Sequence, residues 1–391
     1  MALKQLIRPV FAVVLLVACY QNAMAGSLRK IWDLDLPRAS LAGSTGREQF
    51  PIFQLAFSPD GRKIAVIGDQ IRKAGERGLH SLYVIPATDP QRSPVQLGTT
   101  WDRRQPEWSP DSTVIKSAGA IIRVDTGEHI CEVPEVSRFV GSGLLIAGKR
   151  EGGEGFGDDL AKWRTLREDR PTRFTIYGAD CKPVKEWAAP GQLYIADFSS
   201  YRKVALLNTA HVGNRVIDPI DGKVIEQWDG KNSPDGLFAD KGKAICGGYA
   251  SDEFDIGGRP HSSEYPPKEV IRCWKVDSRQ IIGESPSGHG GIPYSVAADS
   301  TRVVFSNYQY VRGVIRDRDR HVFLKAVVWD FATNQEIASW TPEIQSYDLF
   351  LLKVPNPPKH IEEPFVFAIS PDGEYIAEGG NGKIRLYKIE P

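Results

Sequence analysis

A short motif recurs seven times along this chain: an apolar run, a tight polar turn and a second apolar run. The clearest copies are Phe57-Ser58-Pro59-Asp60-Gly61 and Ile369-Ser370-Pro371-Asp372-Gly373. Weaker copies lie at 108–112, 140–143, 198–201, 238–242 and 297–300. Recurrence of one β-meander specifies a set of small sheets arranged around a common axis. The repeat is therefore the feature that most constrains the fold.

Residues 1–25 have the features of an export signal. Lys4 and Arg8 precede the apolar stretch Val10–Tyr20, and Ala23-Met24-Ala25 is a small-x-small cleavage site. The stretch is shorter than the about 20 residues of a membrane-spanning helix, so we expect no transmembrane helix. A second interpretation stays open, because Leu16-Val17-Ala18-Cys19 resembles a bacterial lipobox, in which the cysteine is acylated. We expect an exported protein, periplasmic or secreted, or alternatively a lipoprotein anchored to the membrane through Cys19.

The charge of the chain argues against two classes of partner. The sequence has 49 Lys and Arg against 49 Asp and Glu, and without Lys4 and Arg8 the balance is 47 to 49. A net charge so close to zero makes nucleic acid or an anionic membrane a poor candidate for the main partner.

Each repeat contains four strand-like runs, except the last. The last has three, at Pro364–Ser370, Tyr375–Gly379 and Lys383–Ile389, whereas a spare strand, Lys30–Leu36, precedes the first repeat. Pairing the spare strand with the last three would close the ring and remove two exposed sheet edges. The sequence thus predicts an all-β fold, a seven-bladed β-propeller closed by its N-terminal strand, in one domain over residues 26–391.

Three stretches resemble WD-repeat and related bacterial β-propellers. They are Ala56–Gly68 and Ala368–Gly380, which share Ser-Pro-Asp-Gly, and Val327–Ile337, which contains Trp329-Asp330. The resemblance covers most of residues 30–391 and implies the propeller fold, but such scaffolds serve many unrelated functions. The Gly-His pair that precedes the first strand of a regular repeat is present only at Gly288-His289. The buried hydrogen-bond network of regular WD repeats is therefore not expected in the other blades.

Four cysteines follow the export signal. In an oxidising compartment they allow three pairings. Cys246 and Cys273 fall on strands expected to be neighbours in one blade, which favours that pair and, by elimination, Cys131 with Cys181. Four buried thiols are the alternative. The sequence has no Cys-x-x-Cys and no Cys/His cluster, so we expect no metal site and no redox-active cysteine.

The long connections are expected on one face of the ring. Connections in a meander alternate between strand ends, so first-to-second and third-to-fourth turns share a face, and those turns are short. Loops longer than about 12–15 residues are uncommon unless they are functional or disordered. We call the opposite side, with the second-to-third loops and the blade crossings, the loop-rich face, and predict that it binds a partner; drift of tolerant loops is the alternative. Its long segments are 69–79, 150–171, 251–268, 308–324 and 341–363.

Two of these segments carry candidate binding residues. In the first, a short helix predicted at 160–168 presents an aromatic residue flanked by arginines, a combination that anchors partners. The alternative is that this helix packs on the rim of the propeller. The carboxylates of the second, 251–268, do not have the spacing of a calcium loop. The candidates in the two segments are Trp163, Arg164, Arg167, Arg259 and His261.

The segment 308–324 contains Arg316-Asp317-Arg318-Asp319-Arg320-His321. Charge that alternates with period two predicts an exposed hairpin extension. The hairpin is either a solvated ribbon or an arginine-rich lip for an anionic ligand, with two tyrosines beneath it. His289 is expected near the same face and is also a candidate. The binding candidates of this region are His289, Tyr308, Tyr310, Arg316 and Arg318.

No catalytic motif is legible, since the sequence lacks Gly-x-Ser-x-Gly and His-Glu-x-x-His. The favoured hypothesis is an exported, non-catalytic scaffold that binds a protein, peptide or glycan and has no cofactor. A second is the propeller subunit of a periplasmic redox enzyme whose redox group belongs to another subunit. A third is a hydrolase or lactonase at the central channel, which requires two titratable groups in hydrogen-bond reach, one with a perturbed pKa.

Overall fold

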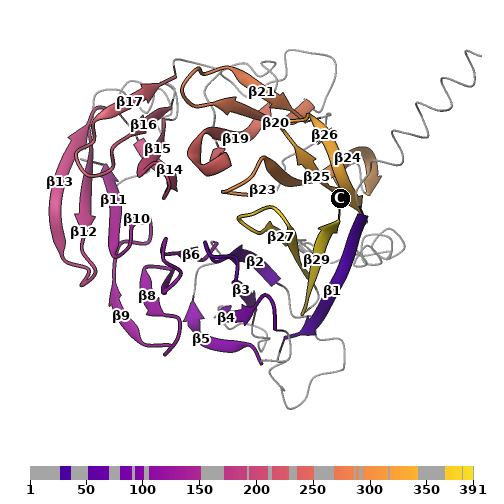
Figure 1. Cartoon of the computed structure of the whole chain (residues 1–391), viewed down its shortest axis with the longest axis horizontal. Helices are drawn as coiled ribbons and strands as arrows, with labels where there is room; N and C mark the ends of the chain where they lie inside the picture. The colour runs from indigo at the N-terminus through magenta and orange to yellow at the C-terminus, as the bar shows by residue number, and fades with distance from the viewer. Residues whose placement is uncertain are drawn as a thin grey trace, which may run out of the picture.

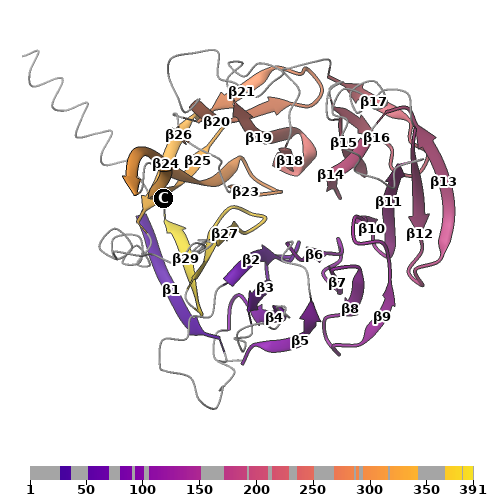
Figure 2. The ribbon, with the colours of Figure 1, turned by 180° about the vertical axis from the view of Figure 1, so that it is seen from behind.

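The computed structural model describes residues 27–36, 52–69, 80–89, 93–100, 105–150, 171–191, 193–209, 214–228, 236–250, 268–285, 288–289, 294–315, 318–341, 366–380 and 382–390. Short antiparallel sheets surround a central axis (Figures 1 and 2). Five are four-stranded, and two more are joined into one nine-stranded sheet. The chain is therefore a seven-bladed β-propeller, as predicted. Within the described ranges, no helix is long and apolar enough to cross a bilayer.

Each blade is a meander that runs outward from the axis. Blades 1 to 3 are β2 (Ile52–Phe57), β3 (Lys63–Asp69), β4 (His80–Pro86), β5 (Val95–Thr100); β6 (Glu107–Trp108), β7 (Val114–Ser117), β8 (Ala120–Arg123), β9 (His129–Glu132); and β10 (Arg138–Gly141), β11 (Leu144–Arg150), β12 (Thr172–Tyr177), β13 (Pro183–Ala189). Blades 4 and 5 are β14 (Leu193–Ser199), β15 (Val204–Thr209), β16 (Arg215–Ile217), β17 (Val224–Gln227); and β18 (Gly236–Ala239), β19 (Ala244–Ala250), β20 (Lys268–Lys275), β21 (Ile281–Glu284). Blades 6 and 7 are β23 (Tyr294–Val296), β24 (Arg302–Ile315), β25 (Arg318–Asp330), β26 (Gln335–Trp340); and β27 (Val366–Ile369), β28 (Tyr375–Gly380), β29 (Lys383–Glu390), β1 (Ser27–Asp35).

The two ends of the described chain share blade 7. β1 pairs antiparallel with β29, from Ser27 opposite Glu390 to Asp35 opposite Lys383, and the two strands lie side by side in Figure 1. The indole Nε1 of Trp32 donates a 2.9 Å hydrogen bond to the carbonyl of Ala87 in blade 1. The closing strand thus belongs to one blade and is bonded to the next, which confirms the predicted closure.

Seven apolar clusters form the core, one between each pair of neighbouring blades. The cluster at the closure joins Ile384 and Leu386 of blade 7 to Ile64 and Val66 of blade 1. Strand side chains alternate between the two faces of a sheet, so each blade supplies one set to each neighbour. Both faces of the inner strands of a blade are therefore covered, while the outer strands remain largely exposed.

The Ser-Pro-Asp repeats close the turns between first and second strands. The hydroxyl of Ser58 donates to Asp60 Oδ1 at 2.6 Å and accepts the amide of Lys63 at 2.9 Å. Ser109 with Asp111 and Ser370 with Asp372 repeat the arrangement. Side-chain oxygens that bond the nearby backbone favour such turns over continued strand. The motif that marks the repeat in the sequence therefore fixes where each first strand ends.

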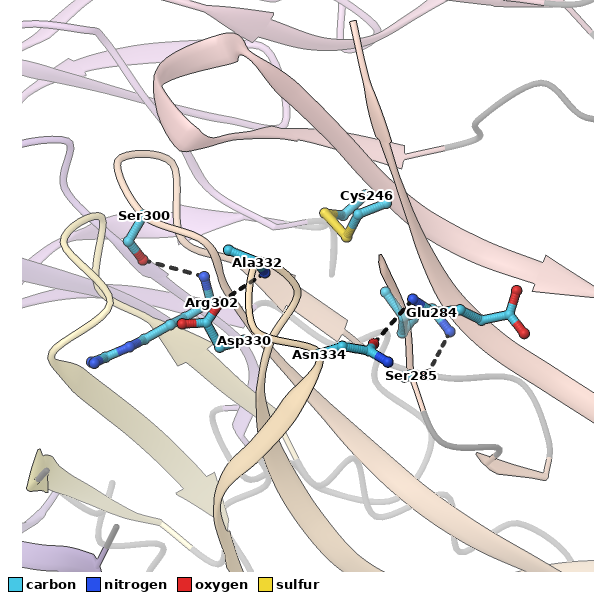
Figure 3. Close-up of a disulfide and its surroundings, with 10 residues drawn as sticks. Cys246, Glu284, Ser285, Ser300, Arg302, Asp330, Ala332 and Asn334 are labelled. Atoms are coloured by element: carbon cyan, nitrogen blue, oxygen red, sulfur yellow. Dashed lines mark hydrogen bonds between the residues drawn. A yellow bond between two sulfur atoms is a disulfide. The ribbon is translucent and has the colours of Figure 1, made fainter. Parts of the chain in front are cut away.

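Both predicted cysteine pairs are disulfides. Cys246 and Cys273 lie opposite each other on β19 and β20 with Cα atoms 4.1 Å apart, fully buried between blades 5 and 6. Cys131 on β9 bonds Cys181, in the β12–β13 turn of the next blade. Figure 3 shows the Cys246 disulfide close to the rim contact in which the Asn334 side chain of blade 6 accepts the Glu284 amide of blade 5. One disulfide thus reinforces a sheet and the other joins two blades.

Blades 5 and 6 are connected by a strand that the sequence did not predict. β22 (Gly288–His289) pairs with both β20 and β24, which makes the nine-stranded sheet. β24 and β25 continue past the blade as one antiparallel hairpin, as far as Ile315 opposite Arg318. The predicted hairpin extension is therefore confirmed, and it stands on the loop-rich side beside the bridging strand.

A buried ion pair within blade 7 also accepts a hydrogen bond from blade 6. Arg385 Nη1 donates to Glu378 Oε1 at 3.0 Å across β28 and β29, and the Trp340 indole of blade 6 donates to Glu378 Oε2 at 2.7 Å. Glu378 and Arg385 are both buried. A charge left buried without its partner is strongly destabilising.

We predict that Glu378→Ala lowers the free energy of unfolding by about 3–5 kcal/mol, because Arg385 keeps a buried charge that has lost its carboxylate. The matched control is Glu336→Ala, which removes a 2.9 Å ion pair with Lys325 on the partly exposed outer part of blade 6. That change should cost at most about 1 kcal/mol. Urea unfolding at neutral pH measures both, and equal losses would contradict the prediction.

Candidate functional site

Two cavities of the propeller share part of their lining. One, of about 540 Å³, opens among the first-to-second turns and is lined by Pro59, Pro110 and Pro371 of three blades. The other, of about 630 Å³, opens on the loop-rich face among blades 2, 3 and 4. Gln105, Glu107 and Arg138 line both cavities. We call the first the channel and the second the cleft.

Seven structurally equivalent positions line the channel, one on the first strand of each blade. The pairing of first and second strands defines the equivalence, with Glu107 opposite Lys116 and Asp197 opposite Leu206. The charged members come from three consecutive blades, so the charge lies on one side of the wall. In blade order the seven residues are Ala56, Glu107, Arg138, Asp197, Leu237, Ser295 and Ala368.

Three of these side chains bond one blade to the next. Glu107 Oε1 accepts the amide of Phe139 at 2.6 Å, and Asp197 Oδ2 accepts the amide of Phe238 at 2.7 Å. The hydroxyl of Ser295 accepts the amide of Ile369 at 3.2 Å. A buried amide needs an acceptor, and here the acceptor belongs to the preceding blade. These residues therefore hold neighbouring blades in register around the axis.

The charge of Glu107 is offset mainly by Lys116. Lys116 Nζ lies 3.4 Å from Glu107 Oε2, with side chains only 8% and 16% exposed. The same ammonium donates to the carbonyls of Glu135 and Ser137, so it is fixed from two sides. Arg138 Nη1 lies 3.5 Å from the same carboxylate oxygen, and its side chain is 43% exposed. Glu107 is thus paired with the buried ammonium of Lys116, whereas the Arg138 side chain lines both cavities.

Asp197 is a carboxyl group of the channel whose pKa is raised. Burial of its carboxyl raises the pKa to about 6, against the lowering effects of the Phe238 and Phe198 amides and of Arg138. The negative charge of Glu107 raises it further. A carboxyl of this kind changes protonation just below neutral pH.

We predict that Asp197→Asn flattens the pH dependence of stability. The folded pKa is raised from 3.8 to about 6, so the favourable contribution is present below pH of about 4 and is lost as the pH rises through about 6. The loss is at most about 3 kcal/mol, and partial exposure makes it smaller. Asparagine does not titrate, so it should remove this pH-dependent contribution to stability. Its carboxamide oxygen can still accept the Phe238 amide. Chemical unfolding between about pH 4 and about pH 7 measures the difference; parallel profiles of the two proteins would contradict it.

The cleft on the loop-rich face has an apolar and aromatic rim. Val136, in the crossing from blade 2 to blade 3, is 59% exposed, and Tyr194 at the start of β14 is 49% exposed. The hydroxyl of Tyr194 accepts a 3.3 Å hydrogen bond from Asn208 Nδ2. Leu193 and Ile195 lie deeper in the cleft. Large exposed side chains beside a concave surface are typical of a binding site.

The mouth of the channel is bordered by Tyr201 and Asp299, from the first-to-second turns of blades 4 and 6. Partial burial and a hydrogen bond to Asp299 raise the pKa of Tyr201 to about 12. Lys241 of blade 5 lies 6.0 Å from the centre of the tyrosine ring. The contacts connect three blades, which makes this mouth a structural rim.

The structure brings only some of the predicted candidates together. His289 on β22 lies opposite Tyr308 on β24, and Tyr310 lies opposite His321, so these positions share one sheet on the loop-rich side. Arg318 is at the end of the same hairpin. Outside the described residues lie Trp163, Arg164, Arg167, Arg259, His261, Arg316 and the lipidation candidate Cys19.

Sequence analysis missed the residues of the channel and the cleft. Glu107-Trp108-Ser109 and Asp197-Phe198-Ser199 place a carboxylate in the same position of two repeats. Superposing the seven copies of the repeat would have shown polar residues where Ala56 and Ala368 stand in the clearest copies. Within the described part of the chain there is no group of three His, Cys, Asp or Glu residues that could hold a metal ion.

No protein-family model matches the chain, and no curated protein matches it. Among solved structures 537 chains match, including the C-terminal WD40 domain of Sif2. That domain has 13% sequence identity and a TM-score of 0.45, over 90% of this chain and 84% of the other. A likeness at this level concerns the fold alone, so function has to be inferred from the residues of the site.

Proposed function

We propose that this chain is an exported, non-catalytic scaffold that binds a protein, peptide or glycan through its loop-rich face. The observation that carries the proposal is the cleft of about 630 Å³ on that face, with Val136 and Tyr194 exposed at its rim. An exposed aromatic residue next to a concave apolar surface supplies contact area at a low entropic cost.

The polar groups of the cleft favour a polypeptide. The buried Lys116–Glu107 pair and the carbonyls of Glu135 and Ser137 place both signs of charge and backbone acceptors along one wall. A peptide presents amide donors and carbonyl acceptors at regular intervals, together with apolar side chains for the rim. A glycan has no comparable apolar side chains for Val136.

Two further features support the proposal. The two disulfides agree with export to an oxidising compartment. The connections between second and third strands, and those between blades, include the segments 70–79, 151–170, 251–267 and 342–365, whose strand ends all lie on the loop-rich side. We propose that Trp163, Arg164, Arg167, Arg259 and His261 contribute to the partner surface.

We predict that Val136→Asp lowers partner capture by at least about tenfold, because the interface would have to bury a new carboxylate. The matched control is Val184→Asp on the outer strand β13, where valine is 60% exposed compared with 59% at Val136. The immobilised protein is exposed to its native envelope fraction, and each retained polypeptide is quantified by mass spectrometry. Equal loss in both variants, or in neither, would contradict the role of the cleft.

Arg318→Ala tests the hairpin as a second contact region. We expect capture of the same partner to fall by about two- to fivefold while the melting temperature stays within about 1 °C, because a rim charge mainly changes the association rate. Trp163→Ala should act in the same direction. A drop of several degrees in melting temperature would show that these residues have structural roles.

A hydrolase with its site in the channel is the second candidate. It is favoured by the raised pKa of Asp197 and by the nearby carboxylate of Glu107. Each carboxylate already accepts an amide of the next blade, which accounts for its position without catalysis. Turnover of an ester or lactone that Asp197→Asn abolishes would reverse this order. The redox-subunit hypothesis has no supporting observation among the described residues.

A further inference from the structure

Arg138 stands out among the channel residues because its guanidinium has no hydrogen-bond acceptor among the described residues. Its Nη1 lies 3.5 Å from Glu107 Oε2, too far for a good hydrogen bond. Its guanidinium donates no hydrogen bond to another described residue, although the side chain lines both the channel and the cleft. A guanidinium carries five N–H donors in a planar fork that matches a carboxylate. Arg138 is therefore placed to bind an anion from the cavity.

The net charge of the side chains around Arg138 allows the channel to bind one anion. Glu107 is offset by buried Lys116 at 3.4 Å. The charged groups that act on Asp197 are Arg138 on β10 and Glu107 on β6, and the Phe238 amide of β18 donates a hydrogen bond to it. With Asp197 protonated, the four side chains carry a net charge of about +1. With Asp197 ionised, the net charge is about zero, and its carboxylate competes for Arg138.

The rest of the channel combines aromatic, proline and serine side chains, with Asp299 at its mouth, and has the size of a small-molecule site. Phe57, Phe139, Phe198 and Phe238 line it around the polar arc of blades 2 to 4. Its volume of about 540 Å³ falls in the range of about 300–1,000 Å³ that is typical of ligand pockets. Such a pocket combines apolar walls with a few convergent polar groups that orient the ligand.

We propose that the channel binds a small monocarboxylate with an apolar or aromatic body, whose carboxylate pairs with Arg138 and whose body contacts Phe57 and Phe198. This site shares Arg138 with the cleft of the loop-rich face, but the ligand body lies against channel residues that do not line the cleft. A ligand carboxylate beside Asp197 is accommodated best when Asp197 is protonated and donates a hydrogen bond to it. Binding therefore takes up a proton, and affinity rises as the pH falls through the range in which Asp197 titrates.

The experiment uses phenylacetate as the probe and phenylacetamide as its uncharged match. Binding to the full chain is measured by titration calorimetry about one pH unit below and about one unit above the Asp197 pKa of about 6. We expect phenylacetate to bind about tenfold more tightly at the lower pH and phenylacetamide to bind weakly at both. Equal binding of the two probes would overturn the proposal, as would no binding of phenylacetate.

Three variants make the test specific. Arg138→Gln should weaken phenylacetate at least about tenfold, because the charged fork is lost. Arg173→Gln is the matched control, since Arg173 Nη1 also lies 3.5 Å from a glutamate and its side chain is 53% exposed, but on β12. Asp197→Asn should keep binding and lose its pH dependence. Unchanged binding in Arg138→Gln, or an unchanged pH dependence in Asp197→Asn, would overturn the proposal.

Two readouts separate folding and the partner surface from this site. Arg138→Gln should melt within about 1 °C of the parent, because Arg138 donates no hydrogen bond to described residues. If it unfolds, Arg138→Lys keeps the charge without the fork, and we expect it to bind phenylacetate several-fold more weakly. Arg318→Ala, on the hairpin of blade 6, should lower partner capture but leave phenylacetate binding unchanged, so failure of partner capture and failure of the carboxylate site are distinguishable.

Discussion

The apolar layers between neighbouring blades are the interaction on which the rest of this structure depends. A blade of four strands is apolar on both faces and cannot bury either face by itself. Each of the seven layers takes side chains from two blades, and the layer between blades 7 and 1 is built like the others. A row of blades would leave two apolar faces in water, whereas a ring leaves none. Closure therefore follows from the same burial that stabilises each neighbouring pair.

Apolar contact does not by itself fix how far one blade slides past the next, and directional bonds supply that information. Close to the axis, Glu107 and Asp197 accept amides of the following blade. At the rim, the Trp32 indole and the Cys131–Cys181 disulfide act between neighbouring blades. Carboxylates used in this way lose hydration, and burial raises the pKa of Asp197 despite its amide bonds. The residues that align the blades therefore also give the channel its polarity.

The features that the sequence predicted are those encoded locally. Alternating strands, Ser-Pro-Asp turns and a surplus strand at 30–36 were sufficient for the seven blades and their closure, and strand adjacency favoured the Cys246–Cys273 pair. The channel and the cleft escaped because Glu107, Arg138 and Asp197 meet only after three repeats are placed around the axis. In the linear sequence each of these residues is only a polar residue at a position where the clearest repeats have alanine. β22 has two residues, too few for a periodic signal, and its pairing depends on two other strands.

The pairing of β1 with β29 has a consequence for the order of folding. Synthesis runs from the N-terminus, so β1 emerges before every other described strand, although its partner emerges last. The intermediate blades can stack progressively while β1 waits as a free edge, a template for wrong partners. The ring can close only after β29, Lys383–Glu390, has been synthesised and pairs with β1. A chaperone that shields the nascent β1 would therefore protect the molecule during its most vulnerable interval.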